Sequence, residues 1–330
     1  MGLYVGIDGG GSKTQVFLMD MERRIGITCI GKASNPNTVP WDAALETMDY
    51  LIHFLMKSIN ASDNEVLGLS FCLAGLSRSE HIEKMKEKFS SIFTNALIEV
   101  SGDALAALTA GTFGTPGVVL IAGTGSVCLG ETETGEIFRA GGYGNLVGDE
   151  GSGFDIGRSG IIAAIQSAEH RGTATILWQK VQSFYQIEQV LDIVPAIYGA
   201  SNPIQSIASF ARIVIESSPH DLVSNQIINK AVDQYIRLIQ SVYIQINHNL
   251  NKKVVLSGSI FTKTTDMRDL LQQKMPDSNF LVLTLSPAAG AVLRAIQYEQ
   301  RMRYAEDYSS REVIKLWEQL ANKAELLSIS

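Results

Sequence analysis

Three consecutive glycines follow the first apolar segment of the chain, in the stretch GIDGGGSKT (6–14). Because glycine has no Cβ, the backbone N–H groups of such a loop can approach an anion closely. Hydroxyl and ammonium side chains add donors, and Asp8 supplies a carboxylate suited to a hydrated Mg²⁺. A tight hairpin turn would also place glycine here. The residues that we predict to bind phosphate in this loop are Gly9, Gly10, Gly11, Ser12, Lys13 and Thr14.

A second loop of the same kind lies in GVVLIAGTGSVCLGET (117–132), where Thr124, Gly125 and Ser126 follow an apolar run. Both loops lead into another strand-like run. A P-loop or a dinucleotide-binding fingerprint would lead into a helix, so both designs are excluded. Two glycine hairpins, one in each half of the chain, predict a clamp on a triphosphate across a cleft.

The periodicity of apolar residues predicts the elements that carry these loops. In the first half, strands are expected at 3–7, 16–19, 25–30, 66–73 and 97–100, with helices at 41–59, at 82–92 and from about 104. In the second half, the stretch 117–132 repeats the pattern of an apolar run, a glycine-and-hydroxyl loop and another apolar run, and a long helical region follows at 157–249. Strands at 254–256 and 280–283 then alternate with helices, of which the last two are expected at 287–300 and 311–327.

This order indicates an α/β protein of two related halves, each with a mixed sheet flanked by helices. A length of 330 residues also suggests about two domains. We predict an N-terminal domain at 1–115 and a C-terminal domain at 116–330, joined near FGTPG (113–117). The helix at 311–327 could pack on either domain.

The composition excludes several classes of protein. Twenty-seven basic residues against 34 acidic ones give a net charge of −7 without a basic run, so we expect no nucleic-acid partner. No apolar stretch reaches about 18 residues, and no secretory leader is evident, so we expect neither a membrane span nor secretion. Cys29, Cys72 and Cys128 lie in apolar runs without CxxC spacing, which indicates buried, reduced thiols in a cytoplasmic protein.

The two loops and a third stretch, VVLSGSIF (254–261), together resemble the sugar-kinase, actin and heat-shock-chaperone superfamily of ATP-binding proteins. GIDGGGSKT is similar to its first phosphate motif and LIAGTGSVCLG to its second. The third stretch is similar to its adenosine motif, in which Gly258 and Ser259 would lie against the nucleotide. The resemblance implies two actin-like (ribonuclease H-like) domains with ATP and Mg²⁺ in the cleft between them.

Three further stretches resemble the N-acetylglucosamine kinase group, particularly its bacterial branch. They are GGYGNLVGDEGSGFDIGRSG (141–160), SNPNT (34–38) and SGDALAAL (101–108). This resemblance implies an ATP-dependent kinase, often a homodimer, that phosphorylates the 6-hydroxyl of an amino sugar such as N-acetylglucosamine or N-acetylmuramic acid. Glucosamine stays open as an acceptor.

The resemblance also assigns roles to single residues. A sugar hydroxyl is a poor nucleophile, so Asp103 is expected to accept its proton, although an Asp before a helix is often only an N-cap. Asp149 and Asn35 are expected to accept hydrogen bonds from sugar hydroxyls. A solvated turn at Asp149 and an Asx-turn at Asn35 are the alternatives. Gly142, Tyr143 and Gly144 would line the acetamido pocket, and Lys13 could instead be a surface lysine.

The sequence departs from the group at two positions. Animal relatives carry a polar residue where Val127 stands and tend to carry tryptophan where Tyr143 stands, which affects the detailed sugar contacts. The cysteine cluster of the repressor and kinase branch that binds zinc is missing as well.

Two other functions were weighed on the same fold. An activase of the benzoyl-CoA reductase type would need cysteines that ligate an iron–sulfur cluster, and the three cysteines here lie in strand-like runs. A sugar-sensing regulator would keep the phosphate loops without the base. Asp103 argues against it, and we expect no DNA-binding segment before Met1 or after Ser330.

Overall fold

The computed structural model describes residues 2–76, 79–246, 253–304 and 310–329. The chain divides into two compact units, unit 1 (Met1–Thr115 and Leu283–Ser330) and unit 2 (Pro116–Val282). The division after Thr115 coincides with the domain boundary expected from the sequence. The second division does not, because residues 283–330, which the sequence assigned to the C-terminal domain, group with unit 1.

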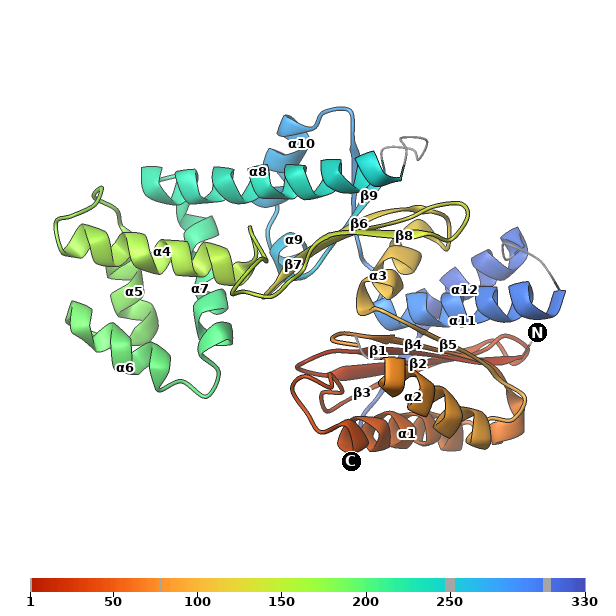
Figure 1. The fold of residues 1–330 in the computed structure, drawn as a ribbon. Coiled ribbons are helices and arrows are strands. Elements are labelled where there is room, and N and C mark those ends of the chain that lie inside the picture. The colour runs from red at the N-terminus through yellow and green to blue at the C-terminus, as the bar shows by residue number, and fades with distance from the viewer. Residues whose placement is uncertain (1, 77–78, 247–252, 305–309, 330) are drawn as a thin grey trace. The chain divides into compact units, whose positions relative to one another are not determined.

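Unit 1 is built on a six-stranded sheet in the order β11-β3-β2-β1-β4-β5 (Figure 1). Strand β1 pairs antiparallel with β2 and parallel with β4, which in turn pairs parallel with β5. The carboxyl ends of β1, β4 and β5 therefore meet at one edge of the sheet, where ligands of α/β proteins usually bind. The strands are β1 (Leu3–Gly9), β2 (Thr14–Asp20), β3 (Ile25–Gly31), β4 (Val66–Leu73), β5 (Leu97–Ser101) and β11 (Glu325–Leu327).

Helices cover both faces of this sheet, as Figure 1 shows. The faces follow from the alternation of side chains along a strand. Val5 and Ile7 of β1 point to the layer formed by α1 (Trp41–Ser58) and α2 (Ser79–Ile92). The short 3₁₀ helix η1 (Asp63–Glu65) lies between α1 and β4 in the chain. Tyr4 of β1 points to the opposite layer. That layer contains α3 (Asp103–Thr112), α11 (Pro287–Tyr304) and α12 (Arg311–Lys323).

Close packing of α11 explains why the C-terminal segment belongs to unit 1. A Cβ on Gly6 of β1 would lie 2.6 Å from the carbonyl oxygen of Ala288, so only glycine lets the helix approach this strand. Gly290 of α11 likewise approaches Ala106 and Ala110 of α3. The small residues on both elements therefore allow backbone contact that larger side chains would prevent.

The end of the chain completes this layer. Trp317 of α12 is fully buried, and its Nε1–H donates to the carbonyl oxygen of Ala289 at 2.8 Å. The predicted helix at 311–327 is too long, because it ends at Lys323 and β11 follows. Strand β11 pairs parallel with β3, so the unpaired edge of β3 determines the conformation of these last residues.

Unit 2 repeats the strand order of unit 1 in a five-stranded sheet, β10-β9-β6-β7-β8. The antiparallel pairs β6–β7 and β7–β8 and the parallel pairs β6–β9 and β9–β10 match those of β1 to β5. The two related halves expected from the sequence are therefore confirmed. The strands are β6 (Gly117–Ala122), β7 (Ser126–Glu131), β8 (Ile137–Gly141), β9 (Lys253–Ser257) and β10 (Asn279–Val282).

The helices of unit 2 lie mostly between β8 and β9. The predicted helical region at 157–249 starts earlier, at Gly153, and its last residues, 247–249, lie outside the described part of the chain. Among the described residues, no helix is both long and apolar enough to cross a bilayer. The helical elements are α4 (Gly153–Ala168), α5 (Leu177–Tyr185), η2 (Val190–Asp192), α6 (Ile193–Tyr198), α7 (Pro203–Ser217), α8 (Leu222–Gln245), α9 (Ser259–Lys263) and α10 (Asp266–Lys274).

Candidate active site

The first glycine loop is the connection of the β1–β2 hairpin. The two strands remain paired up to Gly9 and Thr14, and the N–H of Gly10 donates to the carbonyl oxygen of Lys13 at 2.9 Å. Residues 11–13 are exposed, and within the described residues their backbone N–H groups have no hydrogen-bond partner. Three backbone donors in an exposed, glycine-rich loop thus have no protein partner among the described residues, and such a loop can bind an anion.

A serine outside the motif supports this loop. The hydroxyl of Thr14 donates to Ser34 Oγ at 2.7 Å, and both residues are fully buried. The N–H groups of Ser34 and Asn35 both donate to the carbonyl oxygen of Gly10 at 3.2 Å. The buried hydroxyl of Thr14 therefore holds the base of the loop, and Ser34, which sequence reasoning missed, acts with it.

Asn35 forms the Asx-turn that the sequence offered as an alternative. Its Oδ1 accepts a hydrogen bond from the N–H of Asn37 at 2.9 Å. Its Nδ2 lies on the side of the first loop, 3.8 Å from where a Cβ on Gly11 would stand. The oxygen of Asn35 is thus engaged within the turn, and the amide nitrogen is the group that faces the loop.

Two carboxylates come together at the carboxyl edge of the unit 1 sheet. Asp8 is at the end of β1, and Asp103 follows β5 as the first residue of α3. Burial, and then the negative charge of Asp103, raise the pKa of Asp8 to about 7, although the ammonium group of Lys13 opposes this rise. The first loop, its lysine and both acids therefore act on one another electrostatically.

Asp103 does not occupy the N-cap position that the sequence offered as its alternative role, because it is the first residue of α3. Gly102 occupies the N-cap position of α3, and Asp103 Oδ1 accepts a hydrogen bond from the N–H of Ala104 at 2.9 Å. The carboxylate therefore takes one of the free N–H groups of the first helical turn.

Asp8, with the charge of Asp103 acting on it, fits a divalent cation that keeps part of its water shell. Among the described residues, no cluster of three or more His, Cys, Asp or Glu side chains could hold a metal by protein ligands alone. Mg²⁺ is usually bound by one or two carboxylates together with water and substrate phosphates. The pKa of Asp8 is raised by burial first and by the negative charge of Asp103 second, and a bound cation would oppose both effects.

The second glycine loop connects β6 and β7 and is fixed by the start of α4. The strands are paired up to Ala122 and Ser126, and the N–H of Gly153 donates to the carbonyl oxygen of Gly123 at 2.7 Å. The hydroxyl of Thr124 donates to Gln205 Oε1 at 3.0 Å. Within the described residues, the N–H groups at 124 and 125 have no partner, so this loop also offers backbone donors to an anion.

Asp149 lies against this loop. Its carboxylate accepts hydrogen bonds from the N–H groups of Ser126 and Gly144. A Cβ on Gly125 would stand 2.7 Å from Asp149 Oδ2. Burial raises the pKa of Asp149, and the two hydrogen bonds counteract that rise. The carboxylate of Asp149 is therefore held against the second loop by backbone donors, while the residue itself stays partly exposed.

Ser126 has a different partner from the one expected. Its hydroxyl is buried and donates to the carbonyl oxygen of Glu150 at 2.8 Å. This bond joins the second loop to the GDEGS segment. The hydroxyl thus has a structural role in this conformation.

The predicted adenosine motif lies beside the second loop. Gly258 follows β9 with φ of +92°, and a Cβ there would collide with the backbone of Ala122. Ser259 Oγ lies 3.9 Å from where a Cβ on Gly123 would stand. Because this segment has little side-chain bulk, a flat ligand could lie against its backbone.

The segment Gly142, Tyr143 and Gly144 follows β8 and leads back to Asp149. Both glycines have positive φ, and 69% of Tyr143 is exposed. Arg139 of β8, which the sequence reasoning missed, donates to the carbonyl oxygens of Gly141 and Gly142. In the sequence, the one feature that could have pointed to Arg139 is its position two residues before the glycines at 141 and 142.

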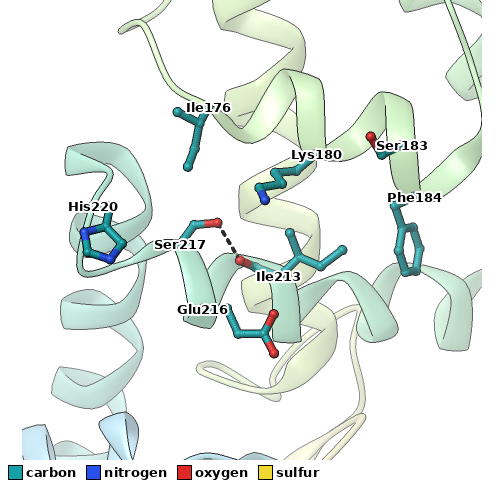
Figure 2. Close-up of a pocket in the computed structure, with 8 residues that line it drawn as sticks. All are labelled: Ile176, Lys180, Ser183, Phe184, Ile213, Glu216, Ser217 and His220. Carbon is teal, nitrogen blue, oxygen red and sulfur yellow. Dashed lines mark hydrogen bonds between the residues drawn. The ribbon is translucent and has the colours of Figure 1, made fainter.

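A pocket elsewhere in unit 2 contains none of the predicted residues. It has a volume of about 330 Å³, and side chains of α5 and α7 line it, with Lys180, Glu216 and His220 as its ionisable groups (Figure 2). The predicted residues therefore group in two places. Unit 1 holds the first loop, Asn35 and the Asp8–Asp103 pair, and unit 2 holds the second loop, Asp149, residues 142–144 and the Gly258–Ser259 turn.

Comparison with known proteins gives consistent matches over most of the chain. Residues 5–295 match the model of the BadF/BadG/BcrA/BcrD ATPase family. The N-acetylmuramic acid/N-acetylglucosamine kinase of Clostridium acetobutylicum is 30% identical over 302 residues, which cover 89% of this chain and 98% of that protein. The N-acetyl-D-glucosamine kinase of Dictyostelium discoideum is 31% identical over 313 residues, with the same coverage of both chains.

Solved structures show the same fold. A protein of Chromobacterium violaceum, provisionally named an N-acetylglucosamine kinase, superposes with a TM-score of 0.70 at 20% identity, over 89% of this chain and 98% of its own. A ROK family glucokinase of Streptomyces griseus, solved with glucose and AMPPNP, gives 0.52 at 15% identity, over 90% of this chain and all of its own. The actin-like ATPase fold expected from the sequence is confirmed.

Proposed function

Because the chain belongs to the BadF/BadG/BcrA/BcrD ATPase family, we propose that it is an ATP-dependent kinase acting on the 6-hydroxyl of an N-acetylated amino sugar. Activity as a sugar kinase is supported by two relatives about 30% identical over almost their whole length. The observation that carries the proposal is the grouping of a glycine hairpin with Asp8 and Asp103 at one sheet edge. N-acetylglucosamine and N-acetylmuramic acid are the proposed acceptors.

Asp103 is the proposed general base. Phosphoryl transfer needs positioning, charge stabilisation and a group that accepts the hydroxyl proton as attack proceeds. The hydrogen bond from the N–H of Ala104 to Oδ1 orients the carboxylate of Asp103. A base of this kind works best when it stays ionised at neutral pH, and a helix N-terminus favours that state.

Backbone groups of the two glycine loops are the proposed partners of the ATP phosphates. Residues 11–13 and 124–125 supply N–H donors that lack a protein partner among the described residues. Lys13 adds a positive charge to the first loop, and Asp8 is the proposed ligand of Mg²⁺. When bound, Mg²⁺ would neutralise charge on the phosphoryl oxygens. Gly258 and Ser259 are proposed to contact the adenosine.

Asp149 is the proposed partner of sugar hydroxyls, together with Asn35 and the segment 142–144. A carboxylate that is already fixed by two N–H donors can accept a further hydrogen bond with little loss of conformational freedom. Such a site rejects a sugar that lacks the matching hydroxyl, because its polar groups would be left unpaired.

An activase function is less well supported by the structure. Such proteins hold an iron–sulfur cluster through cysteine thiolates. Cys29, Cys72 and Cys128 are all buried as free thiols, as the sequence predicted. Burial raises the pKa of each thiol, which disfavours the thiolate needed for ligation.

Asp103→Asn tests the proposed function. We expect turnover with N-acetylglucosamine and ATP to fall by about 10²-fold or more, because the base is lost, while ATP binding measured by calorimetry stays unchanged. Asp42→Asn is the matched control, since Asp42 is an exposed acid in the first turn of α1 of the same unit. Near-normal turnover of Asp103→Asn would contradict the assignment.

The acceptor is tested by a comparative assay. N-acetylglucosamine, N-acetylmuramic acid, glucosamine and N-acetylmannosamine are compared at equal ATP, and NMR of the product identifies the phosphorylated position. Preference for a sugar without an acetamido group, or a phosphate at another hydroxyl, would contradict the proposal.

A further inference from the structure

One side chain contacts three consecutive residues of the glycine-rich segment after β8. Arg139 Nε donates to the carbonyl oxygen of Gly141 at 3.0 Å, and its Nη2 donates to that of Gly142. Its guanidinium group also lies over the ring of Tyr143, 5.6 Å from the ring centroid. A planar guanidinium group can serve two acceptors and stack on an aromatic ring at the same time, which a lysine cannot do.

The segment needs such a restraint because its backbone is unusual. Gly141, Gly142 and Gly144 have φ of +72°, +74° and +89°. Glycine adopts these angles without strain, but it also has the greatest conformational freedom in the absence of other contacts. A Cβ on Gly142 would stand 2.5 Å from Arg139 Nη2 and 2.9 Å from Cβ of Val127, and its φ of +74° favours glycine as well.

The last residue of the restrained segment, Gly144, contacts Asp149, the proposed sugar-binding carboxylate. The N–H of Gly144 donates to Asp149, and the positive charge of Arg139 lowers the pKa of this acid against the effect of burial. Arg139 thus affects Asp149 both through the shape of the segment and through its charge.

We propose that Arg139 is a positioning residue that holds residues 141–144 in the shape that binds the sugar. This inference rests on the proposed function. Arg139 itself uses two of its donor directions on the protein backbone. It therefore acts through Tyr143, Gly144 and Asp149 without serving as a catalytic group.

Steady-state kinetics of Arg139→Ala and Arg139→Lys test the proposal. We expect the KM for N-acetylglucosamine to rise about tenfold in both variants, because two charge-assisted hydrogen bonds are lost or misdirected. The kcat, the KM for ATP and the melting temperature should not change. Arg212→Ala is the matched control, since Arg212 is an exposed arginine of α7 whose ion pair with Glu216 is local.

The outcomes separate positioning from other roles. An unchanged sugar KM in Arg139→Ala would overturn the proposal. Full activity of Arg139→Lys would mean that charge alone matters, and a defect confined to N-acetylmuramic acid would mean that Arg139 binds its carboxylate. Either result would also overturn it. An equal rise in KM for both sugars supports positioning.

A readout without substrate separates this inference from the proposed function. Hydrogen exchange of the amides at 141–149 should be faster in Arg139→Ala than in the wild-type protein, and unchanged in Arg212→Ala. Unchanged exchange in Arg139→Ala would overturn the inference, even if the protein phosphorylates sugars. Faster exchange together with no sugar phosphorylation by the wild-type protein would refute the proposed function and leave the restraint of this segment supported.

Discussion

Replacing Asp8 by Asn should stabilise the protein at alkaline pH while it impairs the proposed activity. Asp8 is partly buried at the end of β1, and the negative charge of Asp103 acts on it. An ionised carboxylate in this place is unfavourable in the absence of a cation. Asn has nearly the same shape without the charge, so the variant isolates the cost of ionisation.

The magnitude follows from the pKa. Burial, followed by Asp103, raises the pKa of Asp8 from 3.8 to about 7. At about 1.36 kcal/mol per pKa unit, the ionised form costs unit 1 at most about 4 kcal/mol of folding free energy. The folded state holds the proton more tightly than the unfolded state. Stability is therefore lost as the pH rises from the ordinary pKa toward 7, and no cost exists below the ordinary pKa.

Thermal unfolding across this pH range, without Mg²⁺ or nucleotide, is the assay. A domain of this size shifts by about 2–4 °C per kcal/mol, so Asp8→Asn should melt up to about 16 °C higher than the wild-type protein at about pH 8. The difference should vanish near the ordinary pKa of 3.8. Asp103→Asn should move the wild-type transition to lower pH, because it removes the neighbouring charge.

Asp42→Asn is the control for this experiment. Asp42→Asn makes the same chemical change at an exposed position, so its effect on the melting temperature should be small and should not follow the titration of Asp8. A constant difference between Asp8→Asn and the wild-type protein at every pH would refute the electrostatic reasoning. Such a result would mean that Asp8 acts by packing or hydrogen bonding alone.

Three further predictions concern other parts of the chain. Gly125→Ala should raise the KM for ATP about tenfold, since its Cβ would stand 2.7 Å from Asp149 Oδ2 and move the loop; an unchanged KM in the kinase assay would count against the loop assignment. Arg294→Met should lower the free energy of unfolding by about 2–3 kcal/mol, because the partly buried carboxylate of Glu99, bonded to Arg294 at 2.6 Å, would lose its cationic partner and keep the hydroxyl of Ser70; urea titration measures this loss, and a value near zero would show that water replaces the guanidinium group. A thiol reagent should modify none of the cysteines in the native protein and all three after unfolding, and rapid native labelling would show that one is accessible. These cysteines are Cys29, Cys72 and Cys128.

Much of the fold was predictable because short-range patterns determine it. The apolar run 66–73 is β4 with the bounds expected, and the helix from Trp41 ends within one residue of its predicted end. The two glycine hairpins also formed as predicted, since a loop of three or four residues between apolar runs has few other conformations.

Other features depend on contacts that the sequence pattern does not contain. Strand β8 was missed because Ile137 and Arg139 are exposed, so its apolar alternation is weak, and pairing with β7 defines it. The assignment of 283–330 to unit 1 depends on Gly6 and Gly290, whose close contacts are long-range. In the candidate site, Asn35 and Asp103 could be identified, but the partners of their side chains could not.

The repeated topology explains how the two units carry different chemistry on one framework. In each unit the first strand leads into a glycine hairpin, and the parallel strand beside it ends at a glycine with positive φ, Gly75 after β4 and Gly258 after β9. Both units can therefore bring backbone to a ligand at equivalent places. The carboxylate of Asp8 has no counterpart in the second hairpin. Asp8 lies one position before the last pair of the β1–β2 hairpin, and Ile121 occupies the same position in the β6–β7 hairpin. At this position the first copy thus carries a carboxylate, and the second carries an apolar side chain beside a loop that offers backbone donors.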